Sequence, residues 1–236
     1  MNTSVARIAV GLMVAIVGVT TIGSRISMSS ALAAGPSAVP APAIDNALAA
    51  KPGQETAVFA GGCFWGIQAV FQHVKGVKSA VSGYAGGTVS SPSYEEVSSG
   101  TTGHAESVRV VFDPSQVSYG TLLRVMFSVA HDPTQLNRQG PDVGTQYRSE
   151  IFYTNAAQEK IATAYIDQLS KAKVYTKPIV TRVSKLNAFN VAEDYHQNYA
   201  NIHPNDPYIR FNDAPKVEAL KTELSTLYKS ELSAWK

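Results

Sequence analysis

The sequence predicts an α+β protein, a ferredoxin-like βαββαβ two-layer sandwich with a mixed sheet and C-terminal helical extensions. Segments with strand character and segments with helical periodicity alternate in this order between residues 57 and 153. Gly- and Pro-containing stretches separate most of them. A composition of 44% hydrophobic and 16% charged residues suits a globular domain with a sizeable core.

The first predicted elements surround a pair of glycines. The apolar run 57–60 predicts a short buried strand that ends at Gly61-Gly62. Residues 63–74 carry apolar side chains at helical spacing, and residues 77–84 predict the next strand. The stretch 85–103 is rich in Gly and Ser, which predicts a loop. Loops of this length are uncommon in compact domains unless they are functional.

The next predicted elements, between residues 106 and 153, are again a strand, a helix and a strand. Residues 106–112 alternate and are β-branched, which predicts a strand, and Asp113-Pro114 ends it. Ser118 is expected to cap a helix that runs to about Val129. The remaining predicted segments are a loop at 131–146, a strand at 147–153, a helix at 156–169, a strand near 179–183 and a helix at 214–228.

The residues before the domain resemble an export signal. Arg7 precedes the apolar run Ile8–Val19, and Ala31-Leu32-Ala33 follows, so residues 1–33 fit a secretory signal peptide. The run is shorter than the ~20 residues that span a bilayer, although an uncleaved anchor stays an alternative. Residues 34–54 are rich in Ala and Pro and predict a tether before a domain at 55–236. We expect an exported, periplasmic protein, or a membrane-tethered one if the signal is retained.

Charge and cysteine content narrow the function. Lys and Arg number 20 against 18 Asp and Glu, a balance that does not suggest a nucleic-acid binder. One cysteine excludes a disulfide within the chain and Cys-rich zinc or iron–sulfur sites. The five histidines show no tight ligand spacing, so no metal and no bound cofactor are expected. A monomer is the default expectation.

The most informative segment is Gly61-Gly62-Cys63-Phe64-Trp65-Gly66. In the predicted strand-to-helix turn, Cys63 lies at the first turn of a helix. Unpaired backbone N–H groups and the positive end of the helix dipole favour the thiolate there. The alternative is a small buried side chain without chemistry. The flanking glycines and aromatic residues favour a reactive cysteine.

Further motifs follow this segment in order along the chain: Gly83-Tyr84-Ala85-Gly86-Gly87, Pro92-Ser93-Tyr94, Gly103-His104-Ala105-Glu106, His131-Asp132-Pro133-Thr134-Gln135, Gly144-Thr145-Gln146-Tyr147-Arg148-Ser149 and Ala192-Glu193-Asp194-Tyr195-His196-Gln197. Together they resemble the motifs of the A-type peptide-methionine sulfoxide reductases over about Thr56 to Tyr208. The resemblance implies thiol-dependent reduction of methionine S-sulfoxide, in proteins and as the free amino acid.

The resemblance also implies the catalytic roles. Cys63 attacks the sulfoxide sulfur and becomes a sulfenic acid. Glu106 protonates the departing oxygen, while Tyr94 and Tyr147 hydrogen-bond to it. Glu106 must therefore be protonated, which requires a dry pocket that raises its pKa. Without the resemblance, an exposed strand carboxylate would be the default for Glu106.

Four further residues are implied to bind the substrate. Phe64 and Trp65 wall an apolar pocket for the terminal methyl group, although core packing is an alternative for Phe64. Asp142 and His196 correspond to residues near the substrate backbone. Asp142 could instead cap a turn, and His196 could lie on a helix surface.

The chain departs from the pattern at two places. Many relatives carry later cysteines that form a disulfide with the sulfenic acid, and none follows Cys63 here. Regeneration then requires an external thiol: thioredoxin, glutaredoxin, glutathione or dithiothreitol. Gln68 occupies a position where relatives usually have Glu, with no predicted consequence.

Two other functions remain open from the sequence. A cysteine hydrolase would pair Cys63 with His104 or His196 as a base. A non-catalytic domain would bind oxidised methionine and retain its affinity after Cys63→Ser.

Overall fold

The computed structural model describes residues 39–235, so the predicted signal peptide lies outside the described residues. The strands are β1 (Glu55–Gly61), β2 (Val77–Ala85), β3 (Ala105–Phe112), β4 (Arg138–Gln139), β5 (Asp142–Val143), β6 (Ser149–Tyr153), β7 (Arg182–Lys185) and β8 (Phe189–Val191). The α-helices are α1 (Phe64–Gln72), α2 (Tyr94–Ser98), α3 (Tyr119–Val125), α4 (Ala156–Lys171), α5 (Tyr199–Ile202) and α6 (Ala214–Glu223).

One six-stranded sheet organises the domain, in the order β7-β6-β1-β3-β2-β8. Its four central strands, β6-β1-β3-β2, are antiparallel and follow a βαββαβ chain order. This arrangement confirms the predicted α+β class and the split βαβ core. β7 pairs with β6 in parallel, which makes the sheet mixed, and β8 extends the opposite edge.

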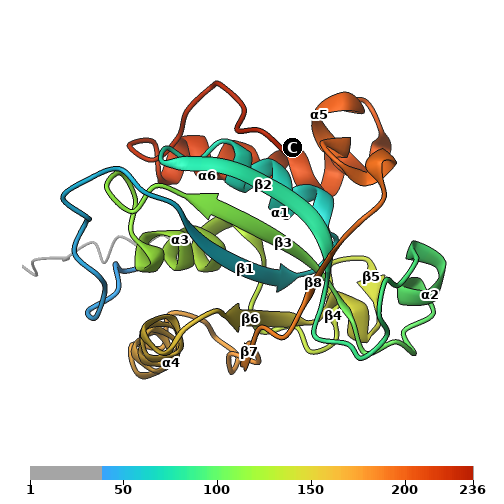
Figure 1. The fold of residues 1–236 in the computed structure, drawn as a ribbon, viewed down its shortest axis with the longest axis horizontal. Coiled ribbons are helices and arrows are strands. Elements are labelled where there is room, and N and C mark those ends of the chain that lie inside the picture. Colours follow the sequence, from blue (N-terminus) through green and yellow to red (C-terminus); the bar gives the residue numbers. More distant parts are fainter. Residues whose placement is uncertain (1–38, 236) are drawn as a thin grey trace, which may run out of the picture. The chain divides into compact units, whose positions relative to one another are not determined.

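Helices α1, α3 and α6 pack on one face of this sheet, beside β1, β2 and β3 (Figure 1). Phe59 of β1 lies at the centre of the core, with ring centroids 5.1 Å from Phe71 and 6.3 Å from Tyr119. Full burial of such a side chain contributes roughly 1.5–3 kcal/mol. A smaller cluster that includes Val58 and Phe152 covers the other face.

The predicted loop at 85–103 contains the short helix α2, which the sequence analysis missed. The hydroxyl of Ser93 accepts a hydrogen bond from the Glu96 backbone N–H, and the Glu96 carboxylate accepts one from the Ser93 N–H. This reciprocal capping box satisfies backbone donors that a five-residue helix would otherwise leave unpaired. The predicted loop at 131–146 likewise contains the β4–β5 hairpin.

Several predicted boundaries differ from the structure. The helix expected to run to about Val129 ends at Val125 and continues as the π-helical turn η1 (Met126–Ala130). The strand expected from 147 begins at Ser149, because residues Thr145–Tyr147 form the 3-10 turn η2. The strand expected near 179 begins at Arg182. The helix expected to reach 228 ends at Glu223, where Leu224 leaves helical geometry with φ −123° and ψ 42°. The predicted cap of α3 is confirmed, since the Ser118 hydroxyl accepts from the Thr121 N–H.

The described part of the predicted tether, residues 39–54, is hydrogen-bonded to the domain. Asp45 accepts hydrogen bonds from the Ser118 hydroxyl and from the Gly120 N–H at the start of α3. The Tyr165 hydroxyl of α4 donates to the Pro40 carbonyl. The domain boundaries themselves stay a prediction. In the part of the chain that the structure describes, no helix is both long and apolar enough to cross a bilayer.

Candidate active site

The turn between β1 and α1 places the cysteine. Gly62 adopts a φ of +101°, which favours glycine, and a Cβ there would lie 2.5 Å from the Gln139 side chain. Gly62 thus allows the turn between β1 and α1 to pack closely against the Gln139 side chain. Cys63 follows as the N-cap residue of α1, as the sequence predicts.

Cys63 opens into a cavity of about 200 Å³. The cavity is lined by Cys63, Phe64, Trp65, Tyr94, Glu106, Asp142, Tyr147 and Tyr208. Seven of these eight side chains are predicted site residues, drawn from α1, α2, β3, β5 and η2. The eighth, Tyr208, was not predicted. The thiol-bearing residue is 8% exposed, so a small group entering the cavity can reach it.

Burial makes Glu106 an acid at neutral pH. The residue is 2% exposed, and removal from water raises the pKa of its carboxyl group to about 8. The Phe64 backbone N–H donates to Oε2 at 3.0 Å and opposes this rise. Because Oε2 accepts that bond, Oε1 is available to carry the proton. Glu106 is therefore a neutral proton donor beside the thiol.

The expected thiolate at Cys63 is not the resting state, which corrects the sequence-based prediction. The Trp65 backbone N–H at the start of α1 does lower the pKa of the thiol. Burial acts in the opposite direction and dominates, with further increases from the carboxylates of Glu106 and Asp213. The pKa therefore lies well above its usual range. Since Glu106 is mostly neutral at pH 7, its repulsion of a thiolate is small there.

Tyr94 and Tyr147 both line the same cavity. Both side chains are half-buried. Burial raises the pKa of each phenol, so both keep their protons across the physiological range. A phenol that keeps its proton can donate to an oxygen without becoming charged itself.

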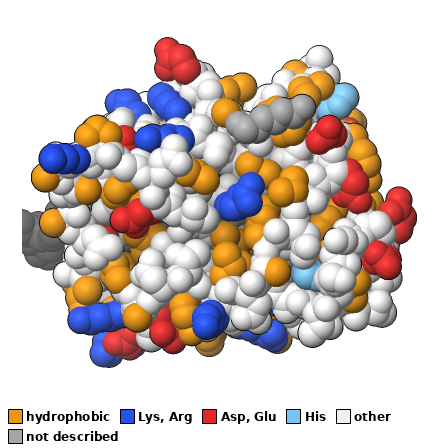
Figure 2. Space-filling model, in the orientation of Figure 1, with side chains coloured by type: hydrophobic (Ala, Val, Ile, Leu, Met, Phe, Trp, Pro, Cys, Tyr) orange, Lys and Arg blue, Asp and Glu red, His pale blue; other side chains and the backbone are white. Residues whose placement is uncertain are grey.

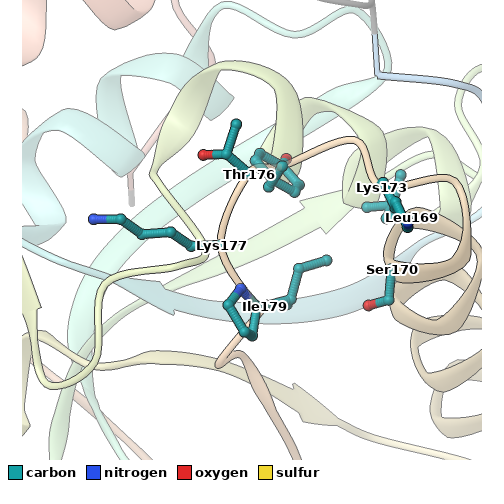
Figure 3. A pocket seen from close by; sticks show the side chains of 8 residues that line it. Leu169, Ser170, Lys173, Thr176, Lys177 and Ile179 are labelled. Carbon is teal, nitrogen blue, oxygen red and sulfur yellow. The ribbon is translucent and has the colours of Figure 1, made fainter.

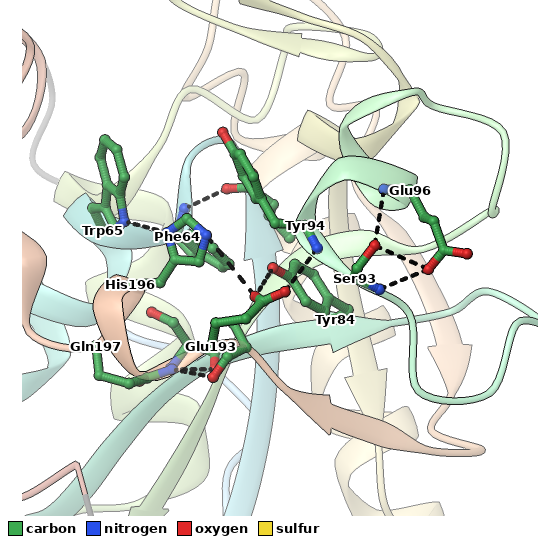
Figure 4. A network of polar contacts seen from close by, with 12 residues as sticks. Phe64, Trp65, Tyr84, Ser93, Tyr94, Glu96, Glu193, His196 and Gln197 are labelled. Carbon is green, nitrogen blue, oxygen red and sulfur yellow. Dashed lines mark hydrogen bonds and ion pairs between the residues drawn. The ribbon is translucent and has the colours of Figure 1, made fainter.

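A carboxylate holds Tyr94 in place, a function that the sequence analysis missed. Glu193 accepts from the Tyr94 backbone N–H at 2.8 Å and from the Tyr84 hydroxyl at 2.8 Å. Figure 4 shows these bonds joining α2, β2 and the segment after β8. Glu193 lies within the motif that runs from Ala192 to Gln197, but its hydrogen-bond partners are distant in the sequence and become evident only in the structure.

The structure places His196 behind the cavity wall, not in contact with its interior. His196 is 2% exposed, and its Nδ1 accepts from the Trp65 indole N–H at 3.2 Å (Figure 4). Its ring lies 5.0 Å from Phe64 and 4.4 Å from Tyr94. Burial lowers the pKa of the imidazole, which favours the neutral form that accepts this bond. His196 thus orients Trp65, and its predicted position near a substrate backbone stays a prediction.

Neither histidine proposed for a hydrolase lies beside the thiol. His104 is 2% exposed, accepts from the Gly87 N–H through Nδ1, and contacts the Val89 carbonyl at 2.8 Å through Nε2. His196 is occupied by Trp65. Both rings are absent from the cavity lining. Within the described residues, neither of these two histidines is therefore placed to act as the base for acyl transfer.

Asp142 and Tyr208 form one wall of the cavity. The Tyr208 hydroxyl donates to Asp142 Oδ2, and both residues line the cavity. Burial and nearby negative charges, Asp142 among them, raise the pKa of the Tyr208 phenol, so it stays a donor. Tyr208 follows Cys63 by 145 positions (208 − 63), and no local pattern marks it.

Gln68 joins three parts of the chain beneath the site. Its Nε2 donates to the Ala80 carbonyl and to Gln197 Oε1, and its Oε1 accepts from the Asn198 N–H. The side chain is 1% exposed. An amide both donates and accepts, which an ionised carboxylate cannot do at this position. Gln68 thus fixes α1 against β2 and the segment that carries His196.

A larger cavity elsewhere lacks this chemistry. It has a volume of about 710 Å³ between the end of α4 and β7, and Figure 3 shows Ser170, Lys173, Thr176 and Lys177 among its lining residues. It contains no carboxylate and no thiol. Within residues 39–235, no group of three or more His, Cys, Asp or Glu side chains could hold a metal ion.

Acidic side chains surround the segments that carry Tyr94 and His196. Glu95 and Glu96 lie on α2, and Glu193 and Asp194 precede His196. Figure 2 shows several acidic side chains at the edge where α2 and α5 lie. An anionic molecule that approaches this edge meets like charge.

Comparisons with known proteins show the family of the chain. A family model described as peptide methionine sulfoxide reductase matches residues 55–227. The chain is 60% identical over 179 residues to the peptide methionine sulfoxide reductase MsrA 2 of Mesorhizobium japonicum, covering 76% of this chain and 92% of the relative. It is 51% identical over 178 residues to MsrA of Deinococcus radiodurans, covering 75% and 86%.

Solved structures show the same architecture. Reduced Mxr1 of Saccharomyces cerevisiae aligns with a TM-score of 0.57 and 30% identity, over 68% of this chain and 94% of Mxr1. Methionine sulfoxide reductase A of Corynebacterium diphtheriae aligns with a TM-score of 0.56 and 38% identity, over 66% and 77%.

An α+β sandwich that presents one cysteine beside a neutral carboxylic acid and phenolic donors defines a cysteine-dependent enzyme with a carboxylic proton donor. The family match over most of the domain makes that class specific. The chain belongs to the peptide methionine sulfoxide reductase family, which confirms the resemblance seen in its motifs.

Proposed function

We propose that this chain reduces methionine S-sulfoxide to methionine, in oxidised proteins and peptides and as the free amino acid. One observation carries the proposal. The single cysteine shares a cavity with an acid that is protonated at pH 7 and with hydroxyl donors. Sulfoxide reduction requires a nucleophile for sulfur and a proton for the departing oxygen, and this cavity provides both.

The first half-reaction moves one oxygen atom between two sulfurs. The Cys63 sulfur attacks the sulfoxide sulfur, and the Glu106 acid protonates the oxygen while Tyr94 and Tyr147 donate hydrogen bonds to it. The oxygen then transfers to Cys63, which becomes a sulfenic acid, and methionine leaves. Cys63 is oxidised by two electrons and the substrate sulfur is reduced by two. Glu106 regains a proton from the Cys63 thiol, so no net proton is consumed.

The second half-reaction consumes an external thiol. One thiol displaces hydroxide from the Cys63 sulfur as water, which gives a mixed disulfide. A second thiol releases Cys63 and leaves as a disulfide. Because the chain has one cysteine, its own residues cannot perform this step. The proposed reductants are thioredoxin, glutaredoxin or glutathione in the cell and dithiothreitol in the assay.

The acidic edge near α2 favours some of these reductants over others. Glutathione carries net negative charge at neutral pH, whereas dithiothreitol is uncharged. Since Glu95, Glu96 and Glu193 lie near the site, we expect dithiothreitol to regenerate Cys63 faster than glutathione at equal thiolate concentration.

A coupled assay with separated sulfoxide epimers tests the function. Wild type with dithiothreitol should convert the S epimer and leave the R epimer unchanged, and Cys63→Ser should convert neither. Circular dichroism of Cys63→Ser provides the folding control. Binding of the S epimer without conversion by wild type would instead support the non-catalytic binding domain. Conversion by Cys63→Ser would contradict the role of the thiol.

We also propose that the enzyme is exported and acts as a monomer in the periplasm. The charged, apolar and small-residue pattern of residues 1–33 supports export. Cell fractionation and N-terminal sequencing test this proposal. A new N-terminus at Ala34 in the periplasmic fraction supports cleavage, an intact N-terminus in the membrane fraction supports an anchor, and a cytosolic protein contradicts export.

A further inference from the structure

A buried ion pair lies against the first turn of α1, outside the cavity. Lys216 Nζ is 3.0 Å from Asp213 Oδ1, and the side chains are 17% and 0% exposed. Neither residue lines the Cys63 cavity. Asp213 ends the π-helical turn η4 (Ile209–Asp213), which begins directly after Tyr208. The pair is thus joined to a cavity wall by a single turn.

Gly66 permits the close approach of this pair. A Cβ at Gly66 would lie 2.1 Å from Asp213 Oδ1 and 2.9 Å from Lys216 Nζ. Gly66 follows Cys63 by three positions, so the two residues share one side of the first helical turn. The ammonium group is therefore packed against the turn that carries the thiol.

The ion pair of Lys216 and Asp213 affects the ionisation of Cys63 through the charges near the thiol. The titratable groups around Cys63 are Glu106, Asp142, Asp213, Lys216, Tyr94, Tyr147, Tyr199 and Tyr208. The Lys216 ammonium group lowers the pKa of this thiol, against burial and the carboxylates of Glu106 and Asp213, which raise it. Asp213 Oδ2 is buried without a hydrogen-bond partner, so its charge is only partly balanced.

We propose that Lys216, held against the first turn of α1 by Asp213, is a positioning residue that stabilises the thiolate form of Cys63. Lys216 increases the fraction of reactive sulfur in a site where burial opposes ionisation. Asp213 fixes the ammonium group and at the same time disfavours the thiolate by its own charge. The catalytic consequence rests on the proposed function, whereas the effect on the thiol does not.

The test is the pH dependence of Cys63 alkylation by iodoacetamide. The chain contains one cysteine, so alkylation reports this thiol alone. Lys216→Met should move the midpoint upward by about one pH unit, which lowers the alkylation rate about tenfold below the midpoint. Asp213→Asn should move it downward. Lys216→Arg keeps the charge and should remain near wild type.

A merely structural pair would not give opposite shifts. The matched control is Lys221→Met, on the same helix, whose side chain is 56% exposed; its profile should coincide with wild type. Shifts in the same direction, or none, for Lys216→Met and Asp213→Asn would overturn the proposal. If Lys216→Met does not fold, the uncharged but polar Lys216→Gln takes its place, and a midpoint at or below wild type overturns the proposal.

Alkylation requires no sulfoxide, so the two proposals fail separately. A wild type that does not reduce sulfoxide would refute the proposed function. The shifts of the alkylation midpoint would still test the effect of Lys216 on the thiol. If the wild type is active, methionine release at pH 7 should slow in Lys216→Met by about the same tenfold factor.

Discussion

Replacing Glu106 by Gln removes the proton donor and little else. A Gln side chain has nearly the same shape and can still accept the Phe64 backbone N–H that now donates to Oε2 at 3.0 Å. It cannot transfer a proton to the sulfoxide oxygen. The substitution therefore separates acid catalysis from the packing of the cavity.

The structure sets the scale of the effect. With a pKa of about 8, Glu106 is about nine-tenths protonated at pH 7. A carboxyl group at the ordinary value of 4.5 would be protonated about 300-fold less often. Loss of general acid catalysis slows a reaction by roughly 10²–10⁴-fold, which corresponds to about 2.7–5.4 kcal/mol of barrier. We expect methionine release from Glu106→Gln to slow by this factor.

The assay is single-turnover release of methionine from the S sulfoxide at pH 7, with substrate concentration varied. The half-saturating concentration should change little, because the lost interaction acts on the transition state. Glu223→Gln is the matched control, since Glu223 is exposed at the end of α6. Release by Glu106→Gln within threefold of wild type would refute the role of Glu106 as the acid.

The same substitution has a thermodynamic signature. Folding raises the pKa of Glu106 from an ordinary value near 4.5 to about 8, so its contribution to stability is present at low pH and is lost as pH rises through 8. The difference in unfolding free energy, Glu106→Gln minus wild type, should rise by about 1.4 kcal/mol per pH unit between pH ~5 and 8. A constant difference in urea unfolding would contradict the neutral acid.

Other parts of the site give three further predictions. Tyr208→Phe removes the hydrogen bond that the Tyr208 hydroxyl donates to Asp142, so single-turnover methionine release should slow about tenfold. An unchanged rate would show that the Tyr208–Asp142 contact does not contribute to methionine release. Gln68→Met leaves buried polar groups unsatisfied and should lower the unfolding free energy in urea by roughly 1–3 kcal/mol; wild-type stability would contradict the bridging role. Without reductant, wild type should release one methionine per chain and stop, with Cys63 labelled by dimedone, because no second thiol is present; absence of the label would contradict a sulfenic acid.

Local patterns were sufficient for most of the fold. The β1–α1 turn follows from an apolar run, two glycines and a change to helical spacing, all within 20 residues of Cys63. The helix α2 also had a local signal, the Ser93-x-x-Glu96 capping box, although the surrounding Gly and Ser residues favoured a loop. The prediction of a loop was wrong here because the capping box of Ser93 and Glu96 outweighs the Gly and Ser content of the stretch.

The errors at the site arise from contacts between distant segments. The helix terminus alone favours a thiolate at Cys63, but burial of the thiol outweighs it, with further opposition from the carboxylates of Glu106 on β3 and Asp213 on η4. The predicted substrate contact of His196 stays a prediction, and the structure adds a contact that the sequence did not predict, from the Trp65 indole N–H to His196 Nδ1. The spacing of residues along the chain determines neither the distance between these contacting side chains nor their burial. Patterns in a single sequence could therefore not predict these contacts.

The central claim is that the Cys63 sulfur takes the sulfoxide oxygen, and isotope transfer measures this directly. Methionine S-sulfoxide labelled with oxygen-18 is mixed with reduced enzyme in unlabelled water without added thiol, and the intact protein mass is recorded at once. The account predicts that wild type gains one oxygen-18 atom per chain, at Cys63, as methionine appears in equal amount, and that Cys63→Ser gains none. Methionine formed while the label appears only in water, with no labelled sulfenic acid at the earliest times, would contradict the account.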